Sequence, residues 1–290
     1  MAVVLVHGGA SNLAGSPLNA AKQAVTEASC AALTLKGASA LDLVEQAVAL
    51  QELAPELNAG VGAVIQMDGR IRLDAAICDS QGRYGAVIQL EQVANPIKVA
   101  RRIAQIGYHS ILSGDGAKSF AVEQGFALTS LYTEKTFAEY AASRAQYPEL
   151  SYAALSGNID DINVKKLSTV GAVALDDDGC LAAACSTGGT KFCFPGRVGD
   201  TPILGAGLYA SEKVAVAMTG EGDKVLRRLT SLKVDQLLAA GASLQEAVDQ
   251  AVDDLLKVTN GYCGIIAVSA KGETAVGHST AFMAHAQQAS

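Results

Sequence analysis

Arg197 and Asp200 stand three residues apart in the glycine-containing run PGRVGD, a spacing that suits recognition of a small zwitterion. An arginine fork binds a carboxylate through two parallel hydrogen bonds, and an aspartate attracts an ammonium group. Together the two side chains could hold both charged groups of a free α-amino acid. The same residues equally suit a surface ion pair within a turn, and the spacing by itself leaves both interpretations open.

Two further runs place threonine beside glycine. TGEGD at residues 219–223 lies between a predicted strand and a predicted helix, where the Thr219 hydroxyl and backbone N–H groups could stabilise an oxyanion. A glycine turn with a helix cap explains the same run without any chemistry. TVGAVALDDDGCLAAACSTGG at residues 169–189 predicts a hairpin, and a tight hairpin would return Thr187 close to Thr169.

Other chemistries lack residues that they need. HGGA at residues 7–10 resembles the oxyanion loop of α/β-hydrolase esterases, but the nucleophile elbow G-x-S-x-G is absent from the chain. The four histidines are too scattered to predict a metal site, and no H-E-x-x-H occurs. No glycine run has the spacing of a dinucleotide fingerprint, so neither a nucleotide nor a redox cofactor is expected.

Composition narrows the class of protein further. Half of the 290 residues are hydrophobic, 18% are charged and the net charge is −7, with no block of Lys or Arg. A partner that is nucleic acid or an anionic membrane is therefore not expected. The first apolar run ends at His7, and none is long enough to span a bilayer. The six cysteines form no metal-binding spacing, which indicates reduced and mostly buried thiols in a cytoplasmic protein.

Hydrophobic periodicity and capping signals, including capping-box spacing at Ser39 and Ser243, predict the elements. Helices are predicted over about residues 20–35, 39–50, 222–241 and 243–258, with another that begins at Pro96. Strands are predicted over residues 3–6, two runs within 61–77 joined at Asp68-Gly69, residues 85–90, both arms of 169–186, and residues 214–218, 262–269 and 273–278. The latter half of the polar segment 129–166 is predicted to be an exposed linker.

Antiparallel hairpins occur in both halves of the chain, and each half has helices long enough to cover a sheet. This pattern predicts an α/β (α+β) fold with stacked sheets between helical layers, and it argues against a doubly wound parallel sheet.

Seven segments, in this order, resemble the family of plant-type L-asparaginases and isoaspartyl peptidases, which are N-terminal nucleophile (Ntn) hydrolases and include the glycosylasparaginases. They reach from residue 5 to about 223: LVHGGA, LNAGVGAVIQMDG, ANPIKVAR, LSGDGAKSFA, STVGAVALDDDGCLAAACSTGG, PGRVGDTPILGAGLYA and TGEGD. The resemblance implies one Ntn-hydrolase domain over residues 1–290, folded as a four-layer αββα sandwich.

The resemblance also implies self-cleavage of the Ser168–Thr169 bond. One subunit would then comprise residues 1–168, with a linker over about 148–168, and the other residues 169–290. The freed Thr169 would carry a nucleophilic hydroxyl and an α-amine that titrates near pH ~8, so it could serve as the base for its own hydroxyl.

Carried over by motif position, each candidate residue acquires a role. Thr169 would be the nucleophile, Thr187 its hydrogen-bonding neighbour, and Thr219 with the N–H of Gly220 the oxyanion site. Arg197 would bind the substrate α-carboxylate, Asp200 the α-ammonium, and Asn58 of the NAG run would support them. The implied reaction is hydrolysis of a β-amide of aspartate, either L-asparagine or a β-aspartyl dipeptide, through an acyl-threonine intermediate.

The family resemblance implies no required cofactor, and it implies a homodimer of processed protomers. It also points to a structural sodium ion in the loop from about Leu53 to Leu57; no other metal is expected.

Two departures from the family pattern keep alternatives open. Ser168 stands where glycine usually precedes the threonine, which leaves room for an unprocessed, inactive relative that serves as a binding or structural protein. Lys191-Phe192 is more similar to glycosylasparaginases, which favours an amidase acting on larger asparagine conjugates.

Overall fold

The computed structural model describes residues 1–12, 14–147 and 169–290. Along the chain its elements are β1 (Val3–Ser11), α1 (Ser16–Leu33), α2 (Ala40–Glu52), the 3₁₀ turn η1 (Gly60–Gly62), β2 (Leu73–Asp79), β3 (Tyr84–Leu90), α3 (Pro96–Ile106), β4 (Ile111–Ser113), α4 (Gly114–Glu123), α5 (Glu134–Gln146), β5 (Val170–Leu175), β6 (Leu181–Thr187), β7 (Leu208–Ala210), β8 (Val214–Gly220), α6 (Gly222–Arg228), α7 (Thr230–Ala239), α8 (Leu244–Thr259), β9 (Cys263–Ser269), β10 (Thr274–His278) and β11 (Phe282–Ala289).

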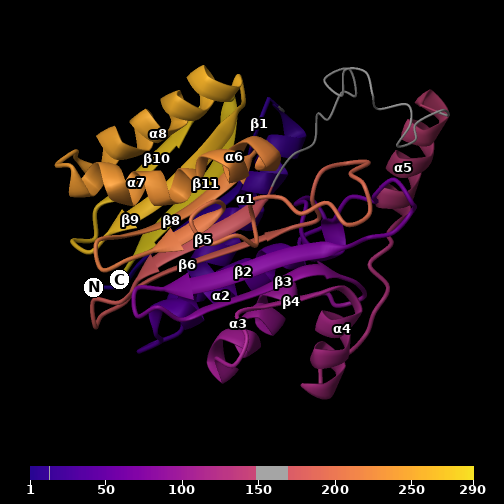
Figure 1. The fold of residues 1–290 in the computed structure, drawn as a ribbon, viewed down its shortest axis with the longest axis horizontal. Coiled ribbons are helices and arrows are strands. Elements are labelled where there is room, and N and C mark those ends of the chain that lie inside the picture. Colours follow the sequence, from indigo (N-terminus) through magenta and orange to yellow (C-terminus); the bar gives the residue numbers. More distant parts are fainter. Residues whose placement is uncertain (13, 148–168) are drawn as a thin grey trace.

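The strands form two sheets (Figure 1). The larger sheet has the order β11-β1-β5-β6-β2-β3-β4, and the smaller has the order β10-β9-β8-β7. Neighbouring strands are antiparallel, apart from the parallel pair β3 and β4. The predicted hairpins at 169–186 and 262–278 are confirmed as β5–β6 and β9–β10.

Three apolar layers hold the sheets and helices together. Val4 and Val6 of β1 face helices α1 to α3, whereas the alternate residues Val3 and Leu5 face the smaller sheet. The smaller sheet alternates in the same way, because the even-numbered residues of β8 face α8 and the odd-numbered residues face the larger sheet. Both faces of the central strands are therefore buried, which explains their nearly continuous apolar sequences. The result is two sheets flanked by helices, as predicted; α7 and α8 run beyond the smaller sheet, and α2 and α3 lie beside β2 and β3 (Figure 1).

The predicted strand within residues 61–67 is wrong, although the turn at Asp68-Gly69 is present. The N–H of Gln66 donates to the Arg70 carbonyl at 2.8 Å and closes the turn. The N–H of Val64, however, donates to the side chain of Asn58, and the N–H of Met67 donates to the Cys193 carbonyl. Because these donors are taken up by loops, the segment pairs with no neighbouring strand among the described residues.

The single helix predicted over 222–241 is also wrong, since it is divided at Leu229. That residue has φ 48°, in the left-handed region that a leucine rarely adopts. The N–H groups of Ser231 and Leu232 donate to the carbonyls of Ala206 and Gly205, so the loop before β7 caps the start of α7. Tertiary contacts therefore end one helix and begin the next where the sequence shows no glycine or proline.

Strand β11 was not predicted, and it completes the edge of the larger sheet by pairing along β1 from Val3 opposite Ala289 to Ser11 opposite Phe282. As an edge strand it keeps much of its length partly exposed, so its sequence FMAHAQQA is only weakly apolar. The short strands β4 and β7 and helix α4 were likewise not predicted.

Several other predictions concern the chain as a whole. All six cysteines are free, with three of them buried. Among the described residues, no helix is both long enough and apolar enough to cross a membrane. The linker predicted at about 148–168, together with Ser168, lies outside the described residues.

Candidate active site

Thr169 directly precedes β5, and its hydroxyl lies beside that of Thr187 at the end of β6. The strand register places Val170 opposite Ser186, which brings the two threonines together. The Thr169 Oγ1 donates to the Thr187 Oγ1 at 3.3 Å, and the Thr187 Oγ1 also accepts from the N–H of Gly189 at 3.0 Å. Both residues are buried, so the Thr169 hydroxyl is fixed in direction by its neighbour.

Asn58 fixes the loop that follows Thr187. Its Nδ2 donates to the Gly189 carbonyl at 2.7 Å, its Oδ1 accepts from the N–H of Val64 at 3.0 Å, and its carbonyl accepts from the N–H of Gly188. A side chain at Gly188 would place its Cβ 2.6 Å from the Asn58 Oδ1, so only glycine fits there. Asn58 therefore positions the backbone next to the two threonines.

Arg197 and Asp200 come together, but they do not form an ion pair with each other. The Nη2 and Nε atoms of Arg197 lie 2.7 and 3.2 Å from the Oδ2 of Asp223, an exposed residue of α6. Asp200 is buried beside them, and a Cβ at Gly222 would lie 2.5 Å from its Oδ1 and 2.9 Å from the Arg197 Nη2. Neither alternative given by the sequence anticipates Asp223 as the partner.

The buried carboxyl of Asp200 is only partly satisfied. Its Oδ2 has no hydrogen-bond partner among the described residues. Burial raises the pKa of Asp200 to about 6, while the neighbouring Arg197 opposes that rise. A buried carboxylate oxygen without a partner is unfavourable for stability and well suited to accept hydrogen bonds from a cationic ligand.

Thr219 and Gly220 end β8, opposite Gly264 and Cys263 of β9. The Thr219 Oγ1 is buried and, in the described part of the chain, has no hydrogen-bond partner. Gly220 has φ 144°, and a Cβ there would lie 2.5 Å from the Tyr262 carbonyl, which excludes any larger residue. At this end of β8 the Thr219 hydroxyl therefore has no other described partner, and position 220 requires glycine.

The predicted site residues form two groups that meet at one loop. Thr169, Thr187 and Asn58 form the first, and Arg197, Asp200 and the 219–222 segment form the second. A Cβ at Gly189 would lie 3.8 Å from the Arg197 Nη1, so the loop after Thr187 borders both groups. Within the described ranges, no hydrogen bond joins Thr169 to the second group.

Asp74 is a neighbour of both groups that the sequence reasoning missed. It lies opposite Thr187 in the pairing of β2 with β6 and is buried. Burial raises its pKa to about 6, and the charge of Arg197 opposes that rise. The signal that could have found it is an aspartate inside the apolar run LDAAI, because a buried acid needs a specific partner.

His7 is packed in the sheet, as expected for a single histidine without metal ligands around it. Its ring occupies the space that Gly171, its partner on β5, leaves by having no side chain. Burial lowers its pKa to about 3, so the ring is neutral at physiological pH. No group of three or more His, Cys, Asp or Glu residues able to hold a metal ion occurs among the residues described.

A cavity of about 400 Å³ adjoins the site at Asn58. Gly8 and Gly9 of the HGGA run form part of its wall, as do Val64 and Lys191. The threonines, Arg197 and Asp200 are not among the described residues that line it. Asn58 therefore lines this cavity and also holds the loop that follows Thr187.

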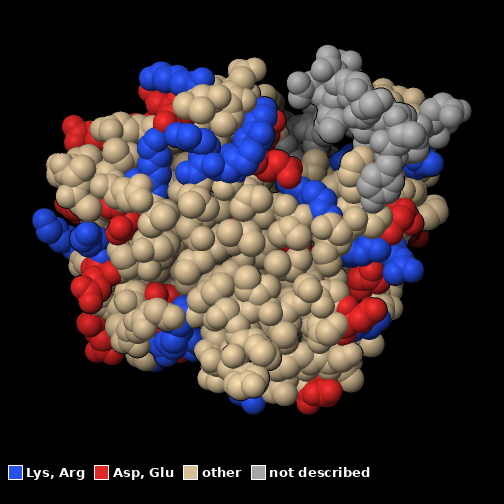
Figure 2. Space-filling view, in the orientation of Figure 1, with Lys and Arg blue, Asp and Glu red and all other residues tan. Residues whose placement is uncertain are grey.

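Basic side chains gather over α6 and α7, next to the 219–222 segment (Figure 2). Most of them have acidic partners: Lys224 with Glu221 at 3.0 Å, and Arg228 and Lys233 with Asp254 at 2.8 and 2.6 Å. These cations are thus partly neutralised by their partners, and Arg197, which pairs with Asp223, borders the candidate site directly.

Comparison with known proteins identifies the family. The family model described as "Asparaginase" matches residues 1–290. The chain belongs to the asparaginase family. Asparaginase-family proteins similar to it include an isoaspartyl peptidase of Salmonella typhimurium, 38% identical over 95% of this chain and 91% of that protein. An isoaspartyl peptidase/L-asparaginase of Bos taurus is 37% identical over 94% of this chain and 89% of that protein.

The glycosylasparaginase branch of the family is also similar. An N(4)-(beta-N-acetylglucosaminyl)-L-asparaginase of Elizabethkingia miricola is 37% identical over 82% of this chain and 70% of that protein. Membership makes this protein a hydrolase of the asparaginase and isoaspartyl peptidase family. Identity alone does not separate the branches, because the two kinds of relative are equally distant.

Replacement of Asn58 by aspartate tests how the asparaginase-family site is held together. The carboxylate of Asn58→Asp can still accept from Val64, but it cannot donate to the Gly189 carbonyl, and it places two acceptors against each other. We expect the free energy of unfolding to fall by about 1–3 kcal/mol, measured by circular dichroism during urea unfolding.

Asn12→Asp is the matched control. Asn12 is exposed, and its Oδ1 accepts from the N–H of Ala281 at 3.0 Å, which an aspartate can do equally well. The control should stay within about 0.5 kcal/mol of the parent. Equal stability of Asn58→Asp and the parent would contradict the positioning role of Asn58.

Proposed function

We propose that this protein is a β-aspartyl amidohydrolase that hydrolyses L-asparagine, β-aspartyl dipeptides or both through an acyl-threonine intermediate on Thr169. The observation that carries the proposal is the buried hydroxyl pair of Thr169 and Thr187, placed where a strand begins and beside a glycine loop. In this proposal the two sheets flanked by helices are the four-layer αββα sandwich of Ntn hydrolases.

Maturation would use the same hydroxyl as catalysis. The Thr169 Oγ1 attacks the carbonyl carbon of residue 168, and the amide nitrogen leaves as the new α-amine, so the amide becomes an ester. Water then hydrolyses the ester and releases the carboxyl end of residues 1–168. Thr187 is suited to hold the attacking hydroxyl because it accepts its hydrogen bond.

In the processed enzyme the α-amine of Thr169 would take the proton of its own hydroxyl. The oxygen then attacks the side-chain amide carbon of the substrate, and the developing oxyanion lies against the Thr219 hydroxyl and the N–H of Gly220. Collapse of the tetrahedral intermediate expels ammonia or an amino acid, which leaves with the proton. Water attacks the resulting ester and frees aspartate.

Arg197 and Asp200 would hold the aspartyl part of the substrate. The Arg197 Nη1 is not used by Asp223, which contacts Nε and Nη2, so one side of the fork is open to an α-carboxylate. The Oδ2 of Asp200, unpartnered among the described residues, supports binding of the α-ammonium at the same place.

Every step uses groups of the chain itself, so no cofactor is required. A structural sodium ion in the loop from about Leu53 to Leu57, a homodimer of processed protomers and a cytoplasmic location stay predictions.

A glycosylasparaginase-like activity is the second candidate, favoured by the Elizabethkingia miricola relative. The third is an unprocessed, inactive relative with a binding or structural role, for which Ser168 is the one argument. The cleavage and substrate measurements below distinguish all three.

Thr169→Ala tests the nucleophile and the maturation together. We expect the parent to age into chains of 168 and 122 residues, and the variant to stay at 290 residues without hydrolysing L-asparagine. Intact-mass spectrometry and ammonia release measure the two outcomes. Thr26→Ala, at an exposed position of α1, should behave as the parent.

Two results would each remove part of this proposal. Asparagine hydrolysis by Thr169→Ala at the parental rate would show that another residue is the nucleophile. A parent that hydrolyses asparagine while its 290-residue chain stays whole would rule out the requirement for autoproteolysis.

The raised pKa of Asp200 predicts how binding of L-aspartate, the product, depends on pH. Above about pH 6 Asp200 is ionised and attracts the α-ammonium; below it the carboxyl is neutral and the attraction is lost. We expect the inhibition constant of L-aspartate to change little just below pH 7 and to rise about tenfold per pH unit below about pH 6.

Asp74 titrates in the same range, so Asp74→Asn is measured alongside. If Asp200 is responsible, the inhibition constant of L-aspartate should still rise below about pH 6 in Asp74→Asn. An inhibition constant that stays constant down to about pH 5 would exclude Asp200 as the ammonium site.

The burial of Phe192 predicts a preference for small substrates over glycosylated asparagine. The sequence associates Lys191-Phe192 with glycosylasparaginases, yet Phe192 is buried and its ring lies 5.7 Å from that of Tyr140. A buried ring is not available to stack on a sugar. We expect kcat/KM for L-asparagine or β-Asp-Leu to exceed that for N-acetylglucosaminyl-asparagine by at least about tenfold. The reverse order would favour the glycosylasparaginase reading.

A further inference from the structure

Gln89 occupies a strained backbone position close to the loop that carries Arg197. It has φ 55°, in the left-handed region that costs a residue with a Cβ atom about 1 kcal/mol or more. The pairing of β2 with β3 is irregular here, because Leu73 faces Leu90 while Ala75 faces Val87, so β3 has one extra residue. The N–H of Gln89 donates to the Oδ1 of buried Asp74 at 2.8 Å, which stabilises the bulge.

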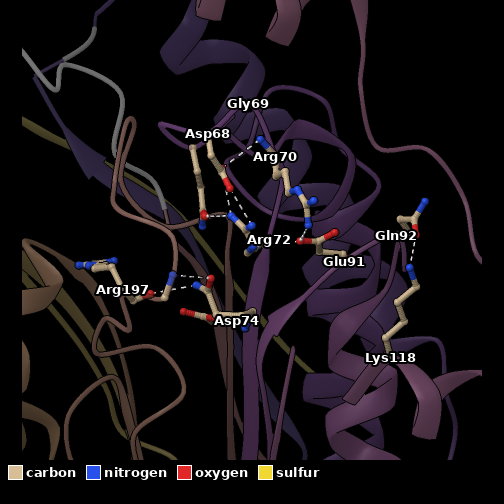
Figure 3. A network of polar contacts seen from close by, with 12 residues as sticks. Asp68, Gly69, Arg70, Arg72, Asp74, Glu91, Gln92, Lys118 and Arg197 are labelled. Atoms are coloured by element: carbon tan, nitrogen blue, oxygen red, sulfur yellow. Dashed lines mark hydrogen bonds and ion pairs between the residues drawn. The ribbon is translucent and has the colours of Figure 1, made fainter. Parts of the chain in front are cut away.

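The bulge directs the Gln89 side chain into the PGR turn, where it makes two hydrogen bonds to the backbone. Its Nε2 donates to the Arg197 carbonyl at 2.9 Å, and its Oε1 accepts from the N–H of Gly196 at 3.2 Å. The amide thus joins two consecutive residues of a turn that belongs to no helix or strand. Figure 3 shows the backbone of Arg197 beside Asp74, with the guanidinium pointing away from it.

The guanidinium is held at its other end by Asp223, through Nε and Nη2. This leaves Nη1, the nitrogen nearest to the position of a Cβ at Gly189. Gln89 therefore fixes the backbone from which the Arg197 side chain extends, and Asp223 fixes the orientation of its guanidinium. A turn that is already ordered loses less conformational entropy when a ligand binds.

We propose that Gln89 is a positioning residue that orders Arg197 for the α-carboxylate of the substrate. The inference rests on the proposed function, in which Arg197 binds that carboxylate. Gln89 itself touches neither the substrate nor the reacting atoms. Its effect is on affinity for ligands that carry an α-carboxylate, and the rate of the chemical step stays within about threefold of the parent.

Gln92 offers a matched control three residues further along. It is also a glutamine with a left-handed backbone, φ 65°, but its side-chain oxygen accepts from Lys118. That contact lies on the opposite side of the view from Arg197 (Figure 3). Substitutions at the two positions remove the same amide from the same backbone conformation, and only one of them affects the PGR turn.

The experiment compares alanine and glycine at both positions in the full-length processed protein. Glycine relieves the left-handed strain, whereas alanine keeps it, so an effect shared by both substitutions comes from the lost amide. The readouts are kcat and KM for L-asparagine and the inhibition constants of L-aspartate and β-alanine, with thermal unfolding as a measure of folding. β-Alanine is L-aspartate without its α-carboxylate.

We expect Gln89→Ala and Gln89→Gly to raise the KM for asparagine and the inhibition constant of L-aspartate by about tenfold, as the loss of two hydrogen bonds suggests. The inhibition constant of β-alanine should change by less than about twofold, and the Gln92 variants should match the parent throughout. A merely structural role would lower the unfolding temperature and affect both inhibitors alike.

Arg197→Ala separates failure of this inference from failure of the proposed function. If Arg197→Ala weakens the binding of L-aspartate and the Gln89 variants do not, Gln89 has no positioning role and the assignment of Arg197 stands. If the Gln89 variants weaken the binding of L-aspartate and of β-alanine equally, Gln89 does not act through the α-carboxylate site and the proposal is refuted. If Arg197→Ala leaves L-aspartate binding unchanged, the carboxylate site is elsewhere and both proposals fall.

Discussion

The candidate site depends on the register between β5 and β6. Thr169 has no structural element of its own, and its place is set by Val170 pairing with Ser186 in the middle of a sheet buried on both faces. A shift of one residue would turn the Thr169 side chain to the other face of the sheet and separate it from Thr187. The apolar layers on either side oppose that shift, because it would place every residue of β5 on the wrong face. The packing of the core and the geometry of the threonine pair are therefore one constraint.

Two buried carboxyl groups lie near this fixed pair, and their burial is unfavourable when they are charged. Asp74 and Asp200 are both buried, and burial raises the pKa of each to about 6 although Arg197 lies nearby. Such carboxyls lower stability in the folded protein without ligand, since their charged forms are poorly solvated. A bound cation would relieve that penalty at Asp200. Local instability of this kind is common where a protein binds a charged ligand, and stable sheets on both sides make it tolerable.

Local signals in the sequence were sufficient for the elements whose hydrogen bonds are local. The hairpin over 169–187 and the capping boxes at Ser39 and Ser243 are present in the structure because turn and cap residues act within a few positions. Prediction failed where distant residues take the hydrogen bonds: at Val64, which bonds to Asn58, and at Leu229, where another loop caps the next helix. The pairing of Arg197 with Asp223 and the roles of Asp74 and Gln89 arise the same way, from chain segments that meet only in the folded protein.

Asn58 and Gln89 meet the same physical requirement in two different loops of the site. Each uses one amide to donate to a loop carbonyl, of Gly189 or Arg197, and to accept from a backbone N–H, of Val64 or Gly196. A carboxylate can only accept and an ammonium can only donate, so neither could satisfy both backbone groups. Either would also add a charge beside Asp74, Asp200 and Arg197, where each buried charge already affects the others. A neutral amide satisfies both backbone groups of each loop and adds no charge beside Asp74, Asp200 and Arg197.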